Sequence, residues 1–168
     1  TPPQQSTWQV PALGPGVALD GRSWPWIQVF EIRYFGEGAY PIGIDVRGSD
    51  HVVVRNNHVH NSPSLIWIRP GSNDARGEGN RLHQSTVTEW PWDAVKRTSH
   101  ENTAISLSGG RGAIVRGNEI WSIFNGIGSG SFADDRNTDI AFDVDVYDNR
   151  LSDLTDDGLE PEGACINN

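Results

Sequence analysis

Four carboxylates occur within seven residues near the end of the chain, in Asp156-Asp157-Gly158-Leu159-Glu160-Pro161-Glu162. Like charges held this close are costly unless a cation or a shared proton relieves them. Hard oxygen ligands suit Ca²⁺, so Asp156, Glu160 and Glu162 are its predicted ligands. Two carboxyl groups with separated pKa values would instead form an acid/base pair. A solvated acidic turn accounts for the same residues without either role.

Arginine side chains form a second group of candidates. Arg47 and Arg69 are predicted to lie on neighbouring coils of the chain, where their guanidinium groups could bind the carboxylates of a uronic-acid polymer in a bidentate manner. The structural alternative is that these arginines pair with Asp45 or stack on Trp67. Both interpretations place the four side chains on one surface.

Tryptophan is frequent, with seven in the sequence. Trp67, Trp90 and Trp92 are predicted to stack on sugars, because an aromatic ring covers the apolar face of a pyranose. The sequence predicts that Trp24, Trp26 and Trp121 pack at an end cap or under turns.

Histidine offers two further possibilities. His58 and His60 flank Val59 and should point the same way, because side chains alternate along a strand. They make a conceivable metal pair, but no third ligand is evident, so we expect exposed turn histidines. His100 precedes a predicted strand and is a candidate acid or base, with a structural role as the alternative.

One short pattern recurs along the chain: an apolar residue, two arbitrary residues, Asn, one arbitrary residue and another apolar residue. Asn57, Asn118 and Asn149 occupy its Asn position, Asn80 lies in a weaker copy, and Phe30 takes that position in an N-terminal copy. The successive steps are 27, 23, 38 and 31 residues. Repeats of this length indicate a solenoid or an array.

The composition of each copy indicates strands rather than helices. Each is a short β-branched run with alternating polarity, followed by Gly, Asn or Asp. An Asn at the same corner of every coil tolerates the left-handed conformation, and its amide can bond the equivalent amide one coil away. Coils spaced by about 4.8 Å suit such a ladder. We therefore predict an all-β solenoid with an Asn ladder.

Five other segments are predicted as strands of one further sheet: 43–47, 65–69, 103–108, 125–128 and 157–162. Placing their Ile, Val and Leu residues inward leaves an outer row on which a linear polymer could lie. Two long insertions, about 86–102 and 129–139, are expected to wall this face. The predicted outer row is Asp45, Arg47, Leu65, Trp67, Arg69, Ser106, Ser108, Gly126, Gly128, Glu160 and Glu162.

The recurring Asn turns resemble those of right-handed parallel β-helix proteins, the superfamily of pectate lyases and polygalacturonases. The resemblance implies a right-handed parallel β-helix of about five or six coils, with a lead and cap over residues 1–25 and the β-helix domain over residues 26–168. Asp156-Asp157 resembles the paired Asp of polygalacturonase-like glycosidases, although the accompanying Gly-His-Gly and Arg-x-Lys motifs are absent. Arg69 resembles the positioned Arg that serves as base in pectate lyase-like enzymes.

Composition limits the partners and the compartment. The net charge of −9 argues against nucleic acid, which needs a basic face. The chain lacks the run of about 20 apolar residues that spans a membrane, so no membrane partner is predicted. The absence of Met suggests a processed chain. The unfinished Asn turn at 164–168 suggests the N-terminal part of a longer solenoid. Another chain could also complete such a solenoid. We expect a secreted or periplasmic protein.

The predicted function is cleavage of an acidic polysaccharide by an exported carbohydrate-active β-helix protein, through lyase or glycoside hydrolase chemistry. The alternative is a non-catalytic glycan-binding or structural segment that assembles with another chain. The predicted catalytic residues are Asp156, Asp157, Glu160, His100 and Arg69. The predicted substrate-binding residues are Arg47, Trp67, Trp90, Trp92 and Asp45.

Overall fold

The computed structural model describes seven parts of the chain: residues 6–8, 14–33, 42–83, 92–97, 101–128, 140–161 and 164–167. Three residues singled out in the sequence, Trp90, His100 and Glu162, lie outside these parts. Among the described residues the only helix is the short α1 (Trp92–Val95), and the remaining elements are β-strands.

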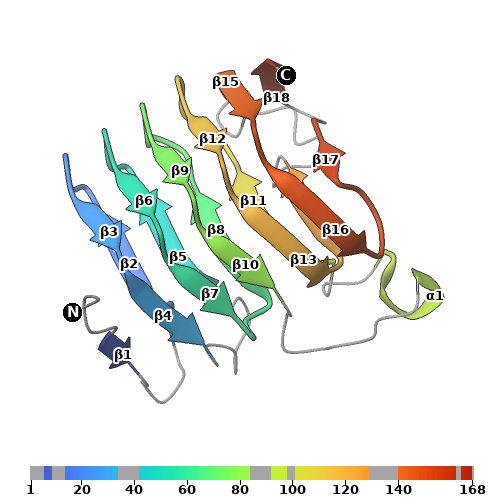
Figure 1. Ribbon diagram of the computed structural model, residues 1–168. Coiled ribbons are helices and arrows are strands. Elements are labelled where there is room, and N and C mark those ends of the chain that lie inside the picture. The colour runs from blue at the N-terminus through green and yellow to red at the C-terminus, as the bar shows by residue number, and fades with distance from the viewer. Residues whose placement is uncertain are drawn as a thin grey trace.

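The strands form three parallel sheets of six strands each, and the chain visits the sheets in turn as it advances along one axis (Figure 1). Sheet A contains β1 (Ser6–Trp8), β4 (Phe30–Arg33), β7 (His58–His60), β10 (Arg81–His83), β13 (Glu119–Ile123) and β16 (Arg150–Leu154). Sheet B contains β2 (Val17–Asp20), β5 (Ile42–Arg47), β8 (Ser64–Ile68), β11 (Thr103–Leu107), β14 (Asn125–Gly128) and β17 (Leu159–Glu160). Sheet C contains β3 (Trp26–Gln28), β6 (Val53–Arg55), β9 (Arg76–Glu78), β12 (Ile114–Arg116), β15 (Ala141–Tyr147) and β18 (Ala164–Asn167).

This arrangement confirms the predicted all-β parallel solenoid of about five or six coils. Every strand pairs with the strand three places on in the chain, so each coil lies on the coil before it. Strands β1 and β2 belong to the predicted lead, and they already pair with β4 and β5.

The Asn ladder runs along the corner between sheets C and A. The side-chain amide of Asn57 donates to Asn80 Oδ1 at 3.1 Å, that of Asn80 to Asn118 Oδ1 at 3.0 Å, and that of Asn118 to Asn149 Oδ1 at 2.9 Å. Each of these oxygens also accepts the backbone N–H of the preceding Asn. At the N-terminal end, Phe30 has no amide, and its backbone N–H donates to Asn57 Oδ1 at 3.1 Å.

The sequence predicted a left-handed backbone at the ladder Asn. In the structure the residue before each ladder position has this backbone instead. Positive φ angles between 53° and 63° occur at the residue before each of the five ladder positions, and the ladder residues themselves have none. The ladder Asn keeps an ordinary backbone because its amide must point along the solenoid axis to reach the next coil. The left-handed residues are Val29, Asn56, Gly79, Gly117 and Asp148.

The core lies between the three sheets and consists of aliphatic side chains stacked coil upon coil. In sheet B, Ile44, Ile66, Ile105 and Ile127 are paired in register, and each is at most 1% exposed. Removing such rows from water is the main stabilising contribution in a fold of this kind. The inward placement predicted for these residues is confirmed.

Two residues predicted on the outer row face the interior instead. Leu65 is completely buried in the core cluster. A Cβ on Gly126 would lie 2.5 Å from Leu151 Cδ2 and 2.4 Å from Gly158 O, so no side chain fits there. Each is the second residue of its strand, next to the corner with sheet A. There the chain turns, and strict alternation of side chains does not yet hold.

Two tryptophans predicted to pack at the cap are exposed. Trp24 is 67% and Trp26 is 55% accessible to solvent. Trp24 stacks on His51 with ring centroids 4.0 Å apart, and the guanidinium of Arg55 lies 4.2 Å above the ring of Trp26. These indole rings therefore pack on surface side chains of the next coil rather than in the interior.

Candidate functional site

The outer face of sheet B carries a polar row that crosses the coils. Cross-strand pairing places Asp45, Trp67, Ser106, Gly128 and Glu160 at equivalent positions of β5, β8, β11, β14 and β17. The row is largely covered by its neighbours, since Asp45 is 3% and Glu160 is 9% exposed. Contact with a ligand would therefore involve the side chains around this row more than the row itself.

Asp45 binds both arginines predicted to face a substrate. Arg47 donates through Nε and Nη2 to Asp45 Oδ2 at 2.9 and 2.8 Å, and Arg69 donates through Nε to Asp45 Oδ1 at 2.6 Å. The Arg47 side chain remains 54% exposed, and that of Arg69 is 20% exposed. The ion pairs with Asp45, which were the structural alternative to substrate binding by these arginines, are therefore present. Arg47 nevertheless remains open to solvent.

Trp67 is held in the same network. The guanidinium of Arg69 lies 3.8 Å above its ring, and its indole Nε1–H donates to Ser108 Oγ at 2.6 Å. One face of the indole is thus occupied by a cation, and the Trp67 side chain as a whole is partly exposed. The structure brings together Asp45, Arg47, Trp67 and Arg69, as the sequence predicted.

Glu160 closes the row at the other end. A Cβ on Gly128 would lie 3.2 Å from Glu160 Oε2 and 3.3 Å from Glu160 Cβ. The absence of a side chain at Gly128 therefore provides room for the Glu160 carboxylate to lie over the neighbouring strand.

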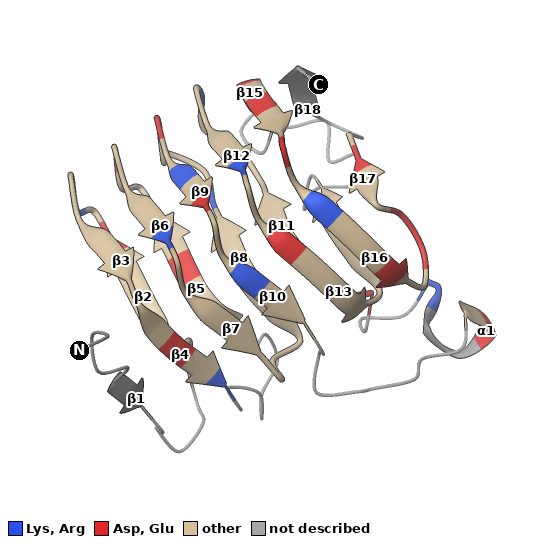
Figure 2. Cartoon of the chain, in the orientation of Figure 1, with Lys and Arg blue, Asp and Glu red and all other residues tan. Residues whose placement is uncertain are grey.

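Asp156 lies in the acidic segment that joins β16 to β17 (Figure 2). Its Oδ2 accepts from the ammonium of Lys96 at 2.6 Å, and Glu101 Oε2 lies 3.4 Å from the same ammonium. Lys96 also lies 4.9 Å from the ring centroid of Trp92, which is itself exposed. The hydrogen bond to Asp156, with the charges of both carboxylates, raises the pKa of Lys96. The insertion that carries α1 is thereby fixed to the acidic segment.

Of the three predicted calcium ligands, Glu162 lies outside the described residues, so the site formed by Asp156, Glu160 and Glu162 stays a prediction. Lys96 supplies a positive charge 2.6 Å from Asp156 Oδ2. The side chain of Asp157 is exposed, and its backbone N–H donates to Asn125 Oδ1 at 3.2 Å. Among the described residues, Asp156, Asp157 and Glu160 do not bring three ligand oxygens close together.

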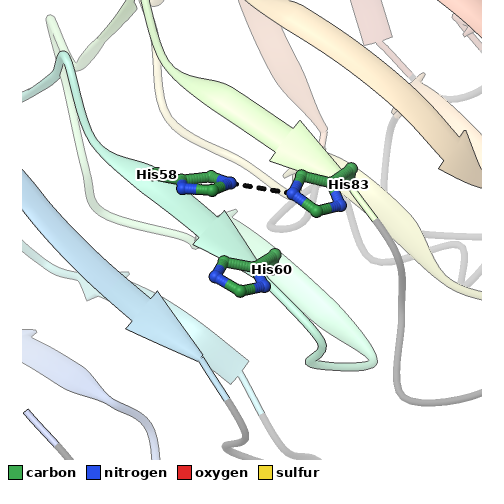
Figure 3. A group of neighbouring side chains, drawn as sticks. All are labelled: His58, His60 and His83. Atoms are coloured by element: carbon green, nitrogen blue, oxygen red, sulfur yellow. Dashed lines mark hydrogen bonds between the residues drawn. The ribbon is translucent and has the colours of Figure 1, made fainter. Parts of the chain in front are cut away.

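A different cluster lies on the outer face of sheet A. His58 and His60 of β7 and His83 of β10 lie side by side (Figure 3), and one ligand nitrogen from each lies within 4.8 Å of the others. His58 Nε2 is 2.8 Å from His83 Nε2. The rings of His60 and His83 stack with centroids 4.9 Å apart, and His83 stacks on Trp121 at 4.4 Å.

The third histidine was missed, although the sequence contained the signal. Asn57 and Asn80 are equivalent ladder positions, and His60 and His83 each follow their Asn by the same interval. The register confirms this alignment, because His83 pairs with His60 and Arg81 pairs with His58. Reading the weaker repeat to its end would have placed His83 beside the two histidines already noted.

The surroundings of this cluster are mixed in charge. His60 Nε2 lies 3.1 Å from Glu31 Oε1, and Arg33 Nη1 lies 3.3 Å from the same oxygen. The hydrogen bond from His60 lowers the pKa of Glu31. Burial, followed by the charge of His60, lowers the pKa of His58, so its neutral form is favoured.

Comparison with known proteins agrees with this architecture. Residues 15–168 match the family described as the right handed beta helix region. The chain therefore belongs to the right-handed β-helix family, and its parallel solenoid is right-handed. No curated protein and no solved structure gives a significant match. Within the described residues, no helix has the length and apolar character needed to cross a membrane.

Proposed function

We propose that this β-helix protein is carbohydrate-active and acts on an acidic polysaccharide along the outer face of sheet B. The observation that carries the proposal is the pairing of Arg47 and Arg69 with one buried carboxylate, Asp45, beside the indole of Trp67. An acidic polymer of this kind would place the protein outside the cytoplasm, as a secreted or periplasmic protein.

Asp45 orients the arginines without exhausting their donors. A guanidinium has five N–H groups, whereas Asp45 contacts Nε and Nη2 of Arg47 and only Nε of Arg69. The remaining donors can bind a uronate carboxylate, and the exposed Arg47 is the more accessible of the two. Side chains held in this way lose little conformational freedom on binding.

The geometry of the solenoid suits a linear ligand. Successive strands of a sheet lie about 4.8 Å apart, so equivalent side chains repeat along the axis. Basic and aromatic groups lie at the β5 and β8 end of sheet B, and Glu160 and Asp156 lie toward the β17 end. A polymer bound along the face would pass from its anchoring residues to the carboxylates.

Asp156 and Glu160 are the proposed catalytic carboxylates, with Asp157 and His100 as further candidates. Inverting hydrolysis requires two carboxyl groups separated by about 6.5–9.5 Å across the bound sugar. Elimination would need a base, and Arg69 is the candidate proposed from the sequence. Arg69 is already paired with Asp45, so hydrolysis by the carboxylates is the preferred form of the proposal.

The test is a screen of the chain against uronic-acid polysaccharides with and without Ca²⁺. New reducing ends without ultraviolet absorbance from a C=C bond would indicate hydrolysis, and that absorbance would indicate elimination. We expect Glu160→Gln and Asp156→Asn to abolish activity, and Arg47→Gln to weaken substrate binding. Arg55→Gln, on sheet C, is the matched control and should change neither activity nor substrate binding. Full activity in both carboxylate variants would exclude the acidic segment from the mechanism.

A non-catalytic glycan-binding segment is the second candidate. It is favoured by the ion pairs that already engage the candidate catalytic residues, since Arg69 pairs with Asp45 and Asp156 pairs with Lys96. Calorimetric binding of an acidic polysaccharide that depends on Arg47, with no product over long incubation, would support this function. Such a segment could also be completed by another chain.

A further inference from the structure

We propose that His58, His60 and His83 form a binding site for a divalent late transition-metal ion of the Zn²⁺ class, on the outer face of sheet A. Neutral imidazole is a preferred ligand for such ions. The site is independent of the proposed polysaccharide surface, which lies on sheet B.

The fold itself places the three rings together. Val59 and Leu82 are paired and buried, so the residues on either side of them point to the outer face. His60 and His83 are register partners on adjacent strands, and His58 lies two residues before His60 on the same side of β7. The rings therefore converge through backbone pairing that the aliphatic core stabilises.

The nitrogen spacing is close to that of a metal site. Zn–N bonds of about 2.0–2.1 Å in a tetrahedral site place ligand nitrogens roughly 3.3 Å apart. Here His58 Nε2 and His83 Nε2 are 2.8 Å apart, and all three ligand nitrogens lie within 4.8 Å of one another. Metal binding would require side-chain rotations that open the short contact and turn the stacked rings so that their lone pairs converge on one ion. A solvent molecule would complete the coordination.

The surrounding residues provide the outer contacts that metal-binding histidines usually have. A carboxylate is an acceptor only, so His60 Nε2 must be the donor in its 3.1 Å contact with Glu31 Oε1. In the neutral His60 ring the proton is therefore on Nε2 and the lone pair is on Nδ1. The same contact fixes the orientation of the ring. Trp121, stacked on His83 at 4.4 Å, restricts the third ring in the same way.

Two arginines lie near the cluster, and each is paired with a carboxylate. Arg33 Nη1 is 3.3 Å from Glu31 Oε1, and Arg81 Nε is 3.6 Å from Glu119 Oε2. The charges of Arg33 and Arg81 are therefore largely offset by Glu31 and Glu119, so these two arginines do little to repel a bound dication. The competing explanation is a stack of surface rings that binds no ion, in which His58 and His83 share one proton.

The experiment is titration of the untagged chain with ZnCl₂ in a calorimeter at neutral pH. We expect one ion per chain, and a dissociation constant that rises at least about 10-fold in His83→Gln and in His58→Gln. Glu31→Gln should raise it by about 10- to 100-fold, the usual effect of losing an outer contact. His51→Gln, a histidine on the sheet C side that stacks on Trp24, is the matched control and should bind as the wild type does.

Measurement on the wild-type protein covers the case in which a variant fails to fold. X-ray absorption at the zinc edge should show three imidazole nitrogens at about 2.0 Å, and Co²⁺ in the same site should give the visible bands of a tetrahedral complex. Absence of binding, equal binding by a folded His83→Gln protein, or a spectrum with oxygen ligands alone would overturn the proposal.

Discussion

The ammonium of Lys96 lies 2.6 Å from Asp156 Oδ2, across 60 residues of sequence. Lys96 belongs to the insertion that follows β10, and Asp156 belongs to the turn before β17. This salt bridge therefore joins an insertion to the proposed catalytic end of sheet B. Since Lys96 is the only lysine of the sequence, its contribution can be measured without interference from other lysine side chains.

Removing the charge of Asp156 should destabilise the protein. We expect Asp156→Asn to lower the free energy of unfolding by about 1–3 kcal/mol, because a charged hydrogen bond is lost and its ammonium partner remains. Urea denaturation measures this change. The matched control is Asp157→Asn, an exposed neighbour that should cost less than about 0.5 kcal/mol. Equal effects of the two substitutions would contradict the assigned role of the salt bridge.

The same salt bridge predicts a loss of stability in alkali. The folded protein raises the pKa of Lys96 above its ordinary value of 10.5, chiefly through the hydrogen bond to Asp156. A raised pKa gives stabilisation that is complete below the ordinary value and disappears as the pH rises through the folded value. The stability difference between wild type and Lys96→Met should therefore be constant near neutral pH and shrink in strong alkali.

Nuclear magnetic resonance of isotopically labelled lysine gives a direct measure of the Lys96 pKa. Asp156→Asn should return the pKa toward its ordinary value, and Asp157→Asn should not. An unchanged pKa in the Asp156 variant would show that the salt bridge does not form in solution.

The middle of the Asn ladder should contribute more to stability than its end. Asn80 accepts two hydrogen bonds from Asn57 and donates two, to Asn118 Oδ1 and Val54 O. We expect Asn80→Ala to cost about 2–4 kcal/mol, because buried donors of the adjacent coils lose their acceptor. Asn149→Ala serves as comparison, since Asn149 is partly exposed, and thermal or urea denaturation should rank it as the milder change.

Val29 is expected to store strain at the first corner. It has a φ of 63°, and the equivalent residues of later coils are Asn56, Gly79, Gly117 and Asp148. A β-branched residue is disfavoured in this conformation by about 1–2 kcal/mol. Val29→Asn should therefore raise the free energy of unfolding by about 1 kcal/mol. This net value includes the opposing cost of losing some buried apolar surface. Gln28→Asn, an exposed neighbour without a positive φ, should be nearly neutral, and a destabilised Val29→Asn protein would argue against strain.

Several features followed from the sequence because they repeat. Asn57, Asn80, Asn118 and Asn149 were found at the correct steps, including the weak copy at Asn80, and the ladder bonds join these four residues in order. The inward rows of sheet B followed from strand alternation. The exceptions, Leu65 and Gly126, lie where strands leave a corner and a simple period of two does not apply.

The sequence by itself determined the solenoid, its ladder and its core, because each coil repeats one local pattern and each Asn needs an identical neighbour. Only the tertiary structure decided which charges neutralise one another and which histidines meet. Arg69 reaches Asp45, and His83 joins His58 and His60, through pairing between coils more than 20 residues apart. Insertions of unequal length change the spacing in sequence, whereas backbone pairing fixes the spacing in space.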